Sequence, residues 1–169
     1  MNVAADLGRP AATLGWPELA ATVHDLARAA CADGLPDVVV GVLRGGMIPA
    51  VMVAHALAVR TVRGVEVVHT LGDGVDARKS ARPQARNLQS LGDLAGLDVL
   101  IVDDIAGSGD TAVRVLDLVR GVGAARTRMA VCVVNAANWR RDDLPEQLLS
   151  YVGVTVEGWV IFPWEMSVP

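Results

Sequence analysis

Aromatic residues are scarce in this chain of 169 residues, which contains one Phe, one Tyr and four Trp. Hydrophobic residues still make up 52% of the sequence, and most of them are Ala, Val and Leu. This composition is typical of α/β proteins in which helices rich in small residues pack on valine strands. A core built mainly from aromatic rings is excluded, so the four Trp residues need an explanation of their own.

Cysteine and clustered positive charge are also scarce. Cys31 falls in an expected helix and Cys132 in an expected strand, which excludes a disulfide framework or a cysteine metal cluster. We expect both to be buried thiols in the reducing cytosol. The net charge is -4, with both signs mixed along the chain. A general nucleic-acid binder would show a basic stripe, so we expect no nucleic-acid partner and only local binding of anions.

Long apolar runs are absent as well. The longest uncharged region, residues 45–59 between Arg44 and Arg60, is too short to span a bilayer and contains Gly-Gly and Pro. The first residues do not show a charged segment followed by a continuous apolar one, as a secretory signal would. We therefore expect a cytoplasmic protein without a membrane partner. Its length fits a single domain over residues 1–169.

Hydrophobic periodicity predicts strands that alternate with helices, hence an α/β fold with a mostly parallel central sheet flanked by helices. Residues 1–15 are expected to be a loose leader. The polar segment 71–90 shows no regular pattern, which favours disorder or a functional lid. The expected elements are a helix over 17–32, a strand over 38–42, a helix over 48–58, strands over 65–70 and 99–102, a helix over 111–120, and strands over 129–134 and 151–156.

The most informative segment is residues 99–111, in which a buried strand runs into Asp103 and Asp104 and then a turn of small and hydroxyl-bearing residues. Such a turn at the start of a helix offers free backbone N–H groups to a phosphate, and the hydroxyls of Ser108 and Thr111 can add donors. The two carboxylates can accept hydrogen bonds from vicinal sugar hydroxyls and help to hold Mg²⁺. This combination favours a phosphorylated sugar as the ligand.

A second turn, Leu43-Arg44-Gly45-Gly46, follows the strand expected at 38–42. Taken alone it is an ordinary connection between a strand and a helix. Its glycines let the backbone approach a ligand closely, and Arg44 offers a fork that matches phosphate oxygens. Because ligands bind at the carboxyl ends of parallel strands, both turns are expected at the same edge of the sheet.

The segment 99–111 resembles the PRPP-binding motif of type I phosphoribosyltransferases, where an apolar strand and two acidic residues precede a loop that usually reads Asp-Thr-Gly-x-Thr. The resemblance implies the type I phosphoribosyltransferase fold with a small C-terminal hood, here about residues 138–169. It also implies a non-proline cis peptide between Leu43 and Arg44, and Mg²⁺ bound by Asp103 and Asp104. The implied PRPP-binding residues are Leu43, Arg44, Gly45, Asp103, Asp104, Ala106, Gly107, Ser108, Gly109, Asp110 and Thr111.

Segment 71–90 takes the place of the flexible catalytic loop of that family. Its basic residues, Arg78, Lys79, Arg82 and Arg86, are either a solvated charge cluster or a group that closes over pyrophosphate and excludes water. We assign catalytic roles to Asp104, Arg44 and Lys79.

The C-terminal segment from Trp159 to Glu165 resembles the Trp-Ile-x-x-Pro-Trp-Asp ending of xanthine-guanine-type members. Core packing is the alternative for such aromatic residues. The resemblance implies that Trp159 stacks on a purine and that the backbone of Val160 contacts its exocyclic edge, with Ile105 as a further base-binding residue. Trp164 is expected to be structural, at a subunit contact. The family commonly forms homodimers or homotetramers.

Two positions depart from the purine enzymes, and both handle the base. Gly107 stands where a carboxylate usually faces N7 of the purine, and Asn135 stands where a Lys usually donates to the 6-oxo group. A glycine cannot accept a proton, whereas an amide both donates and accepts. We therefore expect phosphoribosyl transfer from PRPP to a purine-like base, either a 7-deazapurine or an ordinary 6-oxopurine. A weakly catalytic PRPP-sensing regulator is the alternative.

Overall fold

The computed structural model describes residues 12–70 and 79–165. Its main sheet has six strands in the order β4-β3-β2-β5-β6-β7, all parallel except β4, which pairs antiparallel with β3. This confirms the α/β expectation. The strands are β2 (Val38–Leu43), β3 (Val62–Thr70), β4 (Lys79–Arg86), β5 (Asp98–Ala106), β6 (Arg126–Asn135) and β7 (Tyr151–Val156).

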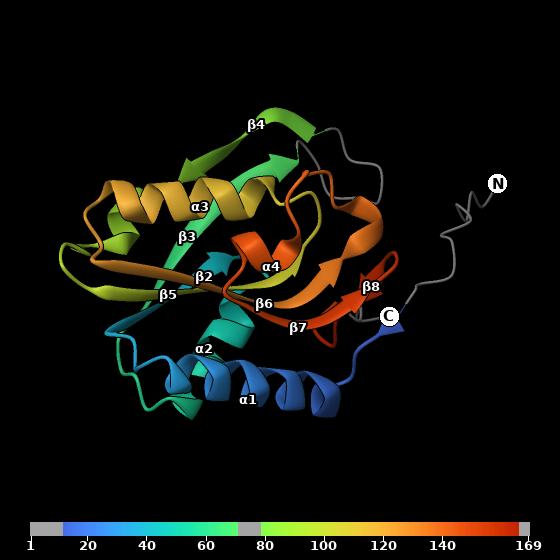
Figure 1. The fold of residues 1–169 in the computed structure, drawn as a ribbon, viewed down its shortest axis with the longest axis horizontal. Coiled ribbons are helices and arrows are strands. Elements are labelled where there is room, and N and C mark those ends of the chain that lie inside the picture. The colour runs from blue at the N-terminus through green and yellow to red at the C-terminus, as the bar shows by residue number, and fades with distance from the viewer. Residues whose placement is uncertain (1–11, 71–78, 166–169) are drawn as a thin grey trace.

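Helices cover both faces of this sheet (Figure 1). Helices α1 (Trp16–Ala32) and α2 (Met47–Ala56) lie on one face, and α3 (Asp110–Gly121) lies on the other. Shorter turns of helix complete the chain: η1 (Leu88–Leu91), η2 (Ala136–Asn138) and α4 (Pro145–Leu148). Among the described residues, the helices are too short or too polar to cross a bilayer.

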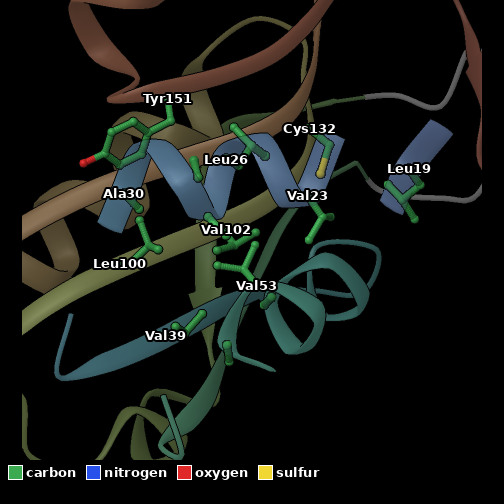
Figure 2. Packing of buried hydrophobic residues seen from close by; sticks show 14 of the residues in the cluster. Leu19, Val23, Leu26, Ala30, Val39, Val53, Leu100, Val102, Cys132 and Tyr151 are labelled. Carbon is green, nitrogen blue, oxygen red and sulfur yellow. The ribbon is translucent and has the colours of Figure 1, made fainter. Parts of the chain in front are cut away.

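Two hydrophobic cores form because the central strands are apolar on both faces. Leu19, Val23 and Leu26 of α1 belong to one cluster of buried side chains with Leu100 and Val102 of β5 (Figure 2). The second core lies under α3 on the opposite face. Continuous runs of Val, Ile and Leu are what a parallel sheet buried on both sides requires, so these strands were readable from the sequence.

A buried arginine, Arg128, links the amino ends of β5, β6 and β7 by hydrogen bonds. These ends lie away from the two turns predicted to bind the ligand. Arg128 is 4% exposed and forms a bidentate ion pair with Asp98, with nitrogen–oxygen distances of 2.9–3.2 Å. Its Nη1 donates to the carbonyl of Ala30 at 2.9 Å and to the hydroxyl of Tyr151 at 3.2 Å. The Tyr151 hydroxyl in turn donates to Asp33 at 2.7 Å. This network fixes α1 against β5, β6 and β7.

Three expectations need correction. Within the polar segment 71–90, residues 79–86 form β4, which pairs with β3, and η1 begins at Leu88. An edge strand tolerates the charges and the proline of β4, and these residues hid its pattern. Residues 12–13 of the supposed leader form β1 (Ala12–Thr13), which pairs with β8 (Val160–Ile161). Finally, Cys31 is exposed, because it lies on the outer side of α1, whereas Cys132 is buried.

Candidate active site

The carboxyl ends of β2 and β5 open onto a cavity of about 650 Å³. Seven of the residues predicted for the site line it: Leu43, Arg44, Gly45, Asp103, Asp104, Ile105 and Thr111. Five more lining residues complete the wall: Val42, Ile48, Val67, Trp164 and Glu165. The turn after β2 and the carboxylate pair therefore meet at one cavity, and Thr111 is the residue of the turn 106–111 that lines it. The other predicted residues of that turn are not among the lining residues: Ala106, Gly107, Ser108, Gly109 and Asp110.

The glycines of the turn Leu43-Arg44-Gly45-Gly46 allow it to approach the two carboxylates closely. A Cβ on Gly45 would overlap the Oδ2 atom of Asp104, and a Cβ on Gly46 would lie 2.6 Å from both Asp103 Oδ1 and the Val42 carbonyl oxygen. Real Cβ atoms do not approach other atoms so closely. The glycines are thus required by the carboxylates beside them, a reason that the sequence alone did not supply. The peptide between Leu43 and Arg44 is cis, as expected.

The two carboxylates are partly desolvated by the loops around them. Asp103 is 7% exposed, and its Oδ1 accepts the backbone N–H of Asp104 at 3.0 Å. Asp104 Oδ1 accepts the backbone N–H of Ile105 at 2.9 Å. Burial, and secondarily the charge of Asp104, raises the pKa of Asp103 well above its ordinary value. Burial also raises the pKa of Asp104, and the charge of Glu165 adds to this.

This pair fits Mg²⁺ in its chemistry. Among the described residues, no group of three or more His, Cys, Asp or Glu side chains is arranged to hold a metal ion. Mg²⁺, however, commonly binds one or two carboxylates and takes its remaining oxygens from water and substrate phosphates. Two crowded carboxylates with raised pKa values gain from a nearby cation. Asp103 and Asp104 are therefore suited to hold the ion together with a phosphorylated ligand.

Burial disfavours the charged form of Asp103, so we expect Asp103→Asn to stabilise the protein. A carboxyl whose pKa is higher in the folded state favours the fold while it is protonated, and this contribution is lost as pH rises through the folded-state pKa. Near neutral pH in metal-free buffer, we expect the variant to be more stable than the wild type, because its side chain carries no buried charge there. Denaturant unfolding checks this, and the gain should shrink as the pH falls. A variant less stable than the wild type at neutral pH would contradict it.

The other turn, residues 106–111, joins β5 to α3. Ala106 ends β5, and Gly109 adopts a φ of +86° immediately before the first residue of α3, Asp110. The hydroxyl of Ser108 donates to Asp110 Oδ2 at 2.8 Å. Gly107 differs from Gly109: its φ is not positive, and a Cβ there would meet only Asn138 Cβ, at 3.7 Å. The position of Gly107 therefore has room for a side chain.

The predicted base-binding residues do not all line the cavity, unlike most of those predicted for the turn after β2 and the carboxylate pair. Asn135 is 3% exposed, and its Oδ1 accepts the backbone N–H of Gly158 at 3.1 Å, so its amide oxygen holds the hood in place. Trp159 is 46% exposed and is not among the residues that line the cavity. The backbone of Val160 pairs with β1. Of these predicted residues, only Ile105 lines the cavity.

Trp164 and Glu165 are the hood residues that do reach the cavity. Trp164 stacks on Phe162 with ring centroids 4.7 Å apart and contacts Trp16 at 6.2 Å, which fits the structural role expected for it. Glu165 accepts the backbone N–H of Phe162 at 2.9 Å. Sequence reasoning missed Glu165, although it occupies the Asp position of the resembling C-terminal segment. Lys79 begins β4, and Arg78 lies outside the described residues.

Comparisons with known proteins agree with this geometry. Residues 12–169 match the phosphoribosyl transferase domain. A xanthine-guanine phosphoribosyltransferase of Roseobacter denitrificans is 34% identical over 138 residues, which cover 80% of this chain and 72% of that protein. A second, from a Ruegeria species, matches with the same identity and coverage.

Solved structures show the same relationship. The crystal structure of a purine phosphoribosyltransferase from Pyrococcus horikoshii superposes with a TM-score of 0.73 at 30% identity, covering 94% of this chain and 95% of that one. A xanthine-guanine-hypoxanthine phosphoribosyltransferase of Helicobacter pylori, at 18% identity and a TM-score of 0.70, shares the fold over 91% of this chain and 92% of its own. Because the domain match runs from β1 to residue 169, this chain belongs to the phosphoribosyltransferase family of enzymes, with the type I fold.

Proposed function

We propose that this enzyme transfers the 5-phosphoribosyl group of PRPP to a ring nitrogen of a purine base. The bond between C1 of the ribose and the pyrophosphate oxygen breaks, a bond from C1 to the base nitrogen forms, and the base loses one proton. The products are a nucleoside 5′-monophosphate and pyrophosphate. The observation that carries the proposal is the meeting of the two turns and the carboxylate pair around one cavity.

The donor side of the reaction is assigned to the two turns. The backbone N–H groups of residues 106–111 and the hydroxyls of Ser108 and Thr111 bind the 5-phosphate. Asp103 and Asp104 accept hydrogen bonds from the ribose hydroxyls and hold Mg²⁺, which neutralises the leaving pyrophosphate when bound. Arg44 and the backbone from Leu43 to Gly45 bind the pyrophosphate. Lys79 is proposed to close over it from the start of β4.

The acceptor side is assigned to Ile105, Asn135, Trp159 and Val160. The half-exposed ring of Trp159 can stack on a flat base, a contact worth about 1–3 kcal/mol. Stacking positions the base nitrogen for attack, and holding both reactants in one site is a large part of the rate enhancement. The names of the relatives favour a 6-oxopurine acceptor such as guanine or xanthine.

A second acceptor class is favoured by Gly107 alone. The space at this position fits a base that carries a substituent on C7, as a 7-substituted 7-deazapurine does, and such a base has no N7 proton for a carboxylate to accept. With an ordinary purine, water would fill the same space. The two classes differ in what occupies the space beside Gly107.

Mixing the enzyme with PRPP, Mg²⁺ and a panel of bases tests the proposal. We expect pyrophosphate release and a nucleoside monophosphate, identified by mass spectrometry, with 6-oxopurines and not with pyrimidines. Turnover of 7-deazapurines but not of guanine or hypoxanthine would instead identify the second class. Binding of PRPP without pyrophosphate release from any base would contradict the enzymatic role and favour a PRPP-sensing regulator. Light scattering of the same preparation tests the homodimer or homotetramer that we also propose.

A further inference from the structure

The segment that follows β6 lies against the phosphate loop, residues 106–111. At Gly109, the position of a Cβ would be 2.5 Å from Arg141 Cδ and 3.1 Å from the ring of Trp139. Farther back along the loop, Asn138 is the neighbour of Gly107. The lack of a side chain at Gly109 therefore lets the stem of Arg141 pack directly on the backbone that is proposed to bind phosphate.

The guanidinium of Arg141 is held by one neighbour. Its Nε donates to Asp143 Oδ1 at 2.7 Å and its Nη2 donates to Asp143 Oδ2 at 3.0 Å. Asp143 is itself fixed, because its backbone carbonyl accepts the indole N–H of Trp139 at 2.7 Å. About a third of each side chain in the Arg141–Asp143 pair is exposed. The pair therefore presents an arginine fork beside the loop, on the surface of the molecule.

A cation at this position would offset negative charge on the phosphate loop. Asp110, the first residue of α3, adds a negative charge to the loop, and this charge attracts Arg141. A phosphate monoester would bring up to two further negative charges to the same place. Backbone N–H groups and hydroxyls offer only partial charges. Of the described residues that touch the loop at Gly107 and Gly109, namely Asn138, Trp139 and Arg141, only the last carries a positive charge.

We propose that Arg141 is a phosphate-binding residue of this enzyme, which pairs with Asp143 in the present structure and donates to the 5-phosphate of the bound sugar. Arginine suits this role because its planar fork bonds two phosphate oxygens at once. An ion pair between partly exposed side chains is weak, so a phosphate can compete with Asp143 for the guanidinium. The inference rests on the proposed function, because it takes the 5-phosphate to bind at residues 106–111.

The test compares the binding of ribose 5-phosphate and of pyrophosphate, each with Mg²⁺, by calorimetry. In Arg141→Gln we expect the dissociation constant for ribose 5-phosphate to rise roughly 10- to 100-fold, the worth of a charge-assisted hydrogen bond. Pyrophosphate binding should be unchanged, because it is assigned to the other turn. Arg140→Gln is the matched control, since it removes a neighbouring exposed arginine, and it should bind both ligands as the wild type does.

Asp143→Asn separates phosphate binding from a purely structural role. Removing the competing carboxylate should leave ribose 5-phosphate binding as tight as in the wild type or tighter. If Asp143→Asn instead weakens binding as much as Arg141→Gln does, the pair only shapes the loop and the inference is wrong. Wild-type affinity in Arg141→Gln also overturns it, with the proposed function intact. Failure of the wild type to bind ribose 5-phosphate overturns the proposed function, and the inference falls with it.

Discussion

Replacing Gly45 with alanine is expected to lower kcat/KM for PRPP by roughly 100-fold or more, which corresponds to about 3 kcal/mol. The added Cβ would occupy the place of Asp104 Oδ2, so the carboxylate must turn away. It then loses the orientation in which it can meet the ribose hydroxyls and the metal ion. Steady-state kinetics with PRPP as the varied substrate measures the effect. Because the displaced atom ends a side chain, the Tm should change little.

Alanine substitutions at two other glycines serve as comparisons for this prediction. Gly121→Ala at the end of α3 is the control, because a Cβ there meets no atom within 4 Å. It should keep full activity and gain up to about 1 kcal/mol of stability, since alanine favours a helix over glycine. Gly46→Ala would press on the backbone of Val42 and Asp103, so it should lower stability as well as activity. Wild-type kinetics in Gly45→Ala would show that Asp104 does not contact the donor.

The parts of the fold that the sequence predicted are those with a strong local signal. The runs of Val and Ile in β2, β5 and β6 indicated buried parallel strands, and they are fully buried where expected. Asp103 and Asp104 stand out because two carboxylates directly after an apolar run have no role in its packing, and the structure places both within the last part of β5. The strand-to-helix turns follow from the alternation of elements, so their meeting at one edge was foreseeable.

The parts that were missed depend on their pairing partners and not on a local sequence pattern. β4 is charged and contains Pro83, so nothing local marks it as a strand, and it exists because β3 offers a free edge. β1 has two residues and exists because β8 pairs with it. In the site, nothing local indicated that the amide oxygen of Asn135 accepts the backbone N–H of Gly158. Tertiary packing determines which group becomes the hydrogen-bond partner of a buried amide.

Replacing Gly107 with aspartate is expected to raise kcat/KM for 6-oxopurines by about 100-fold, the lower end of what a positioned general base contributes. The backbone at Gly107 has an ordinary φ, and a Cβ would contact only Asn138, at normal van der Waals distance. An aspartate can therefore be accommodated without moving the loop. The resemblance to purine enzymes implies that a carboxylate at this position faces N7 of the purine, where it can accept the proton that the base releases as it attacks C1.

Gly107→Asn supplies the same bulk without a titratable group, so it separates proton transfer from filling of space. We expect it to leave 6-oxopurine turnover near the wild-type level. A 7-substituted 7-deazapurine should react more slowly with both variants, because either side chain occupies the room of its substituent. If aspartate and asparagine act alike on guanine, position 107 does not handle the proton. The cavity itself would then be the place to look for the proton acceptor, and Glu165 is a lining carboxylate outside the Asp103–Asp104 pair.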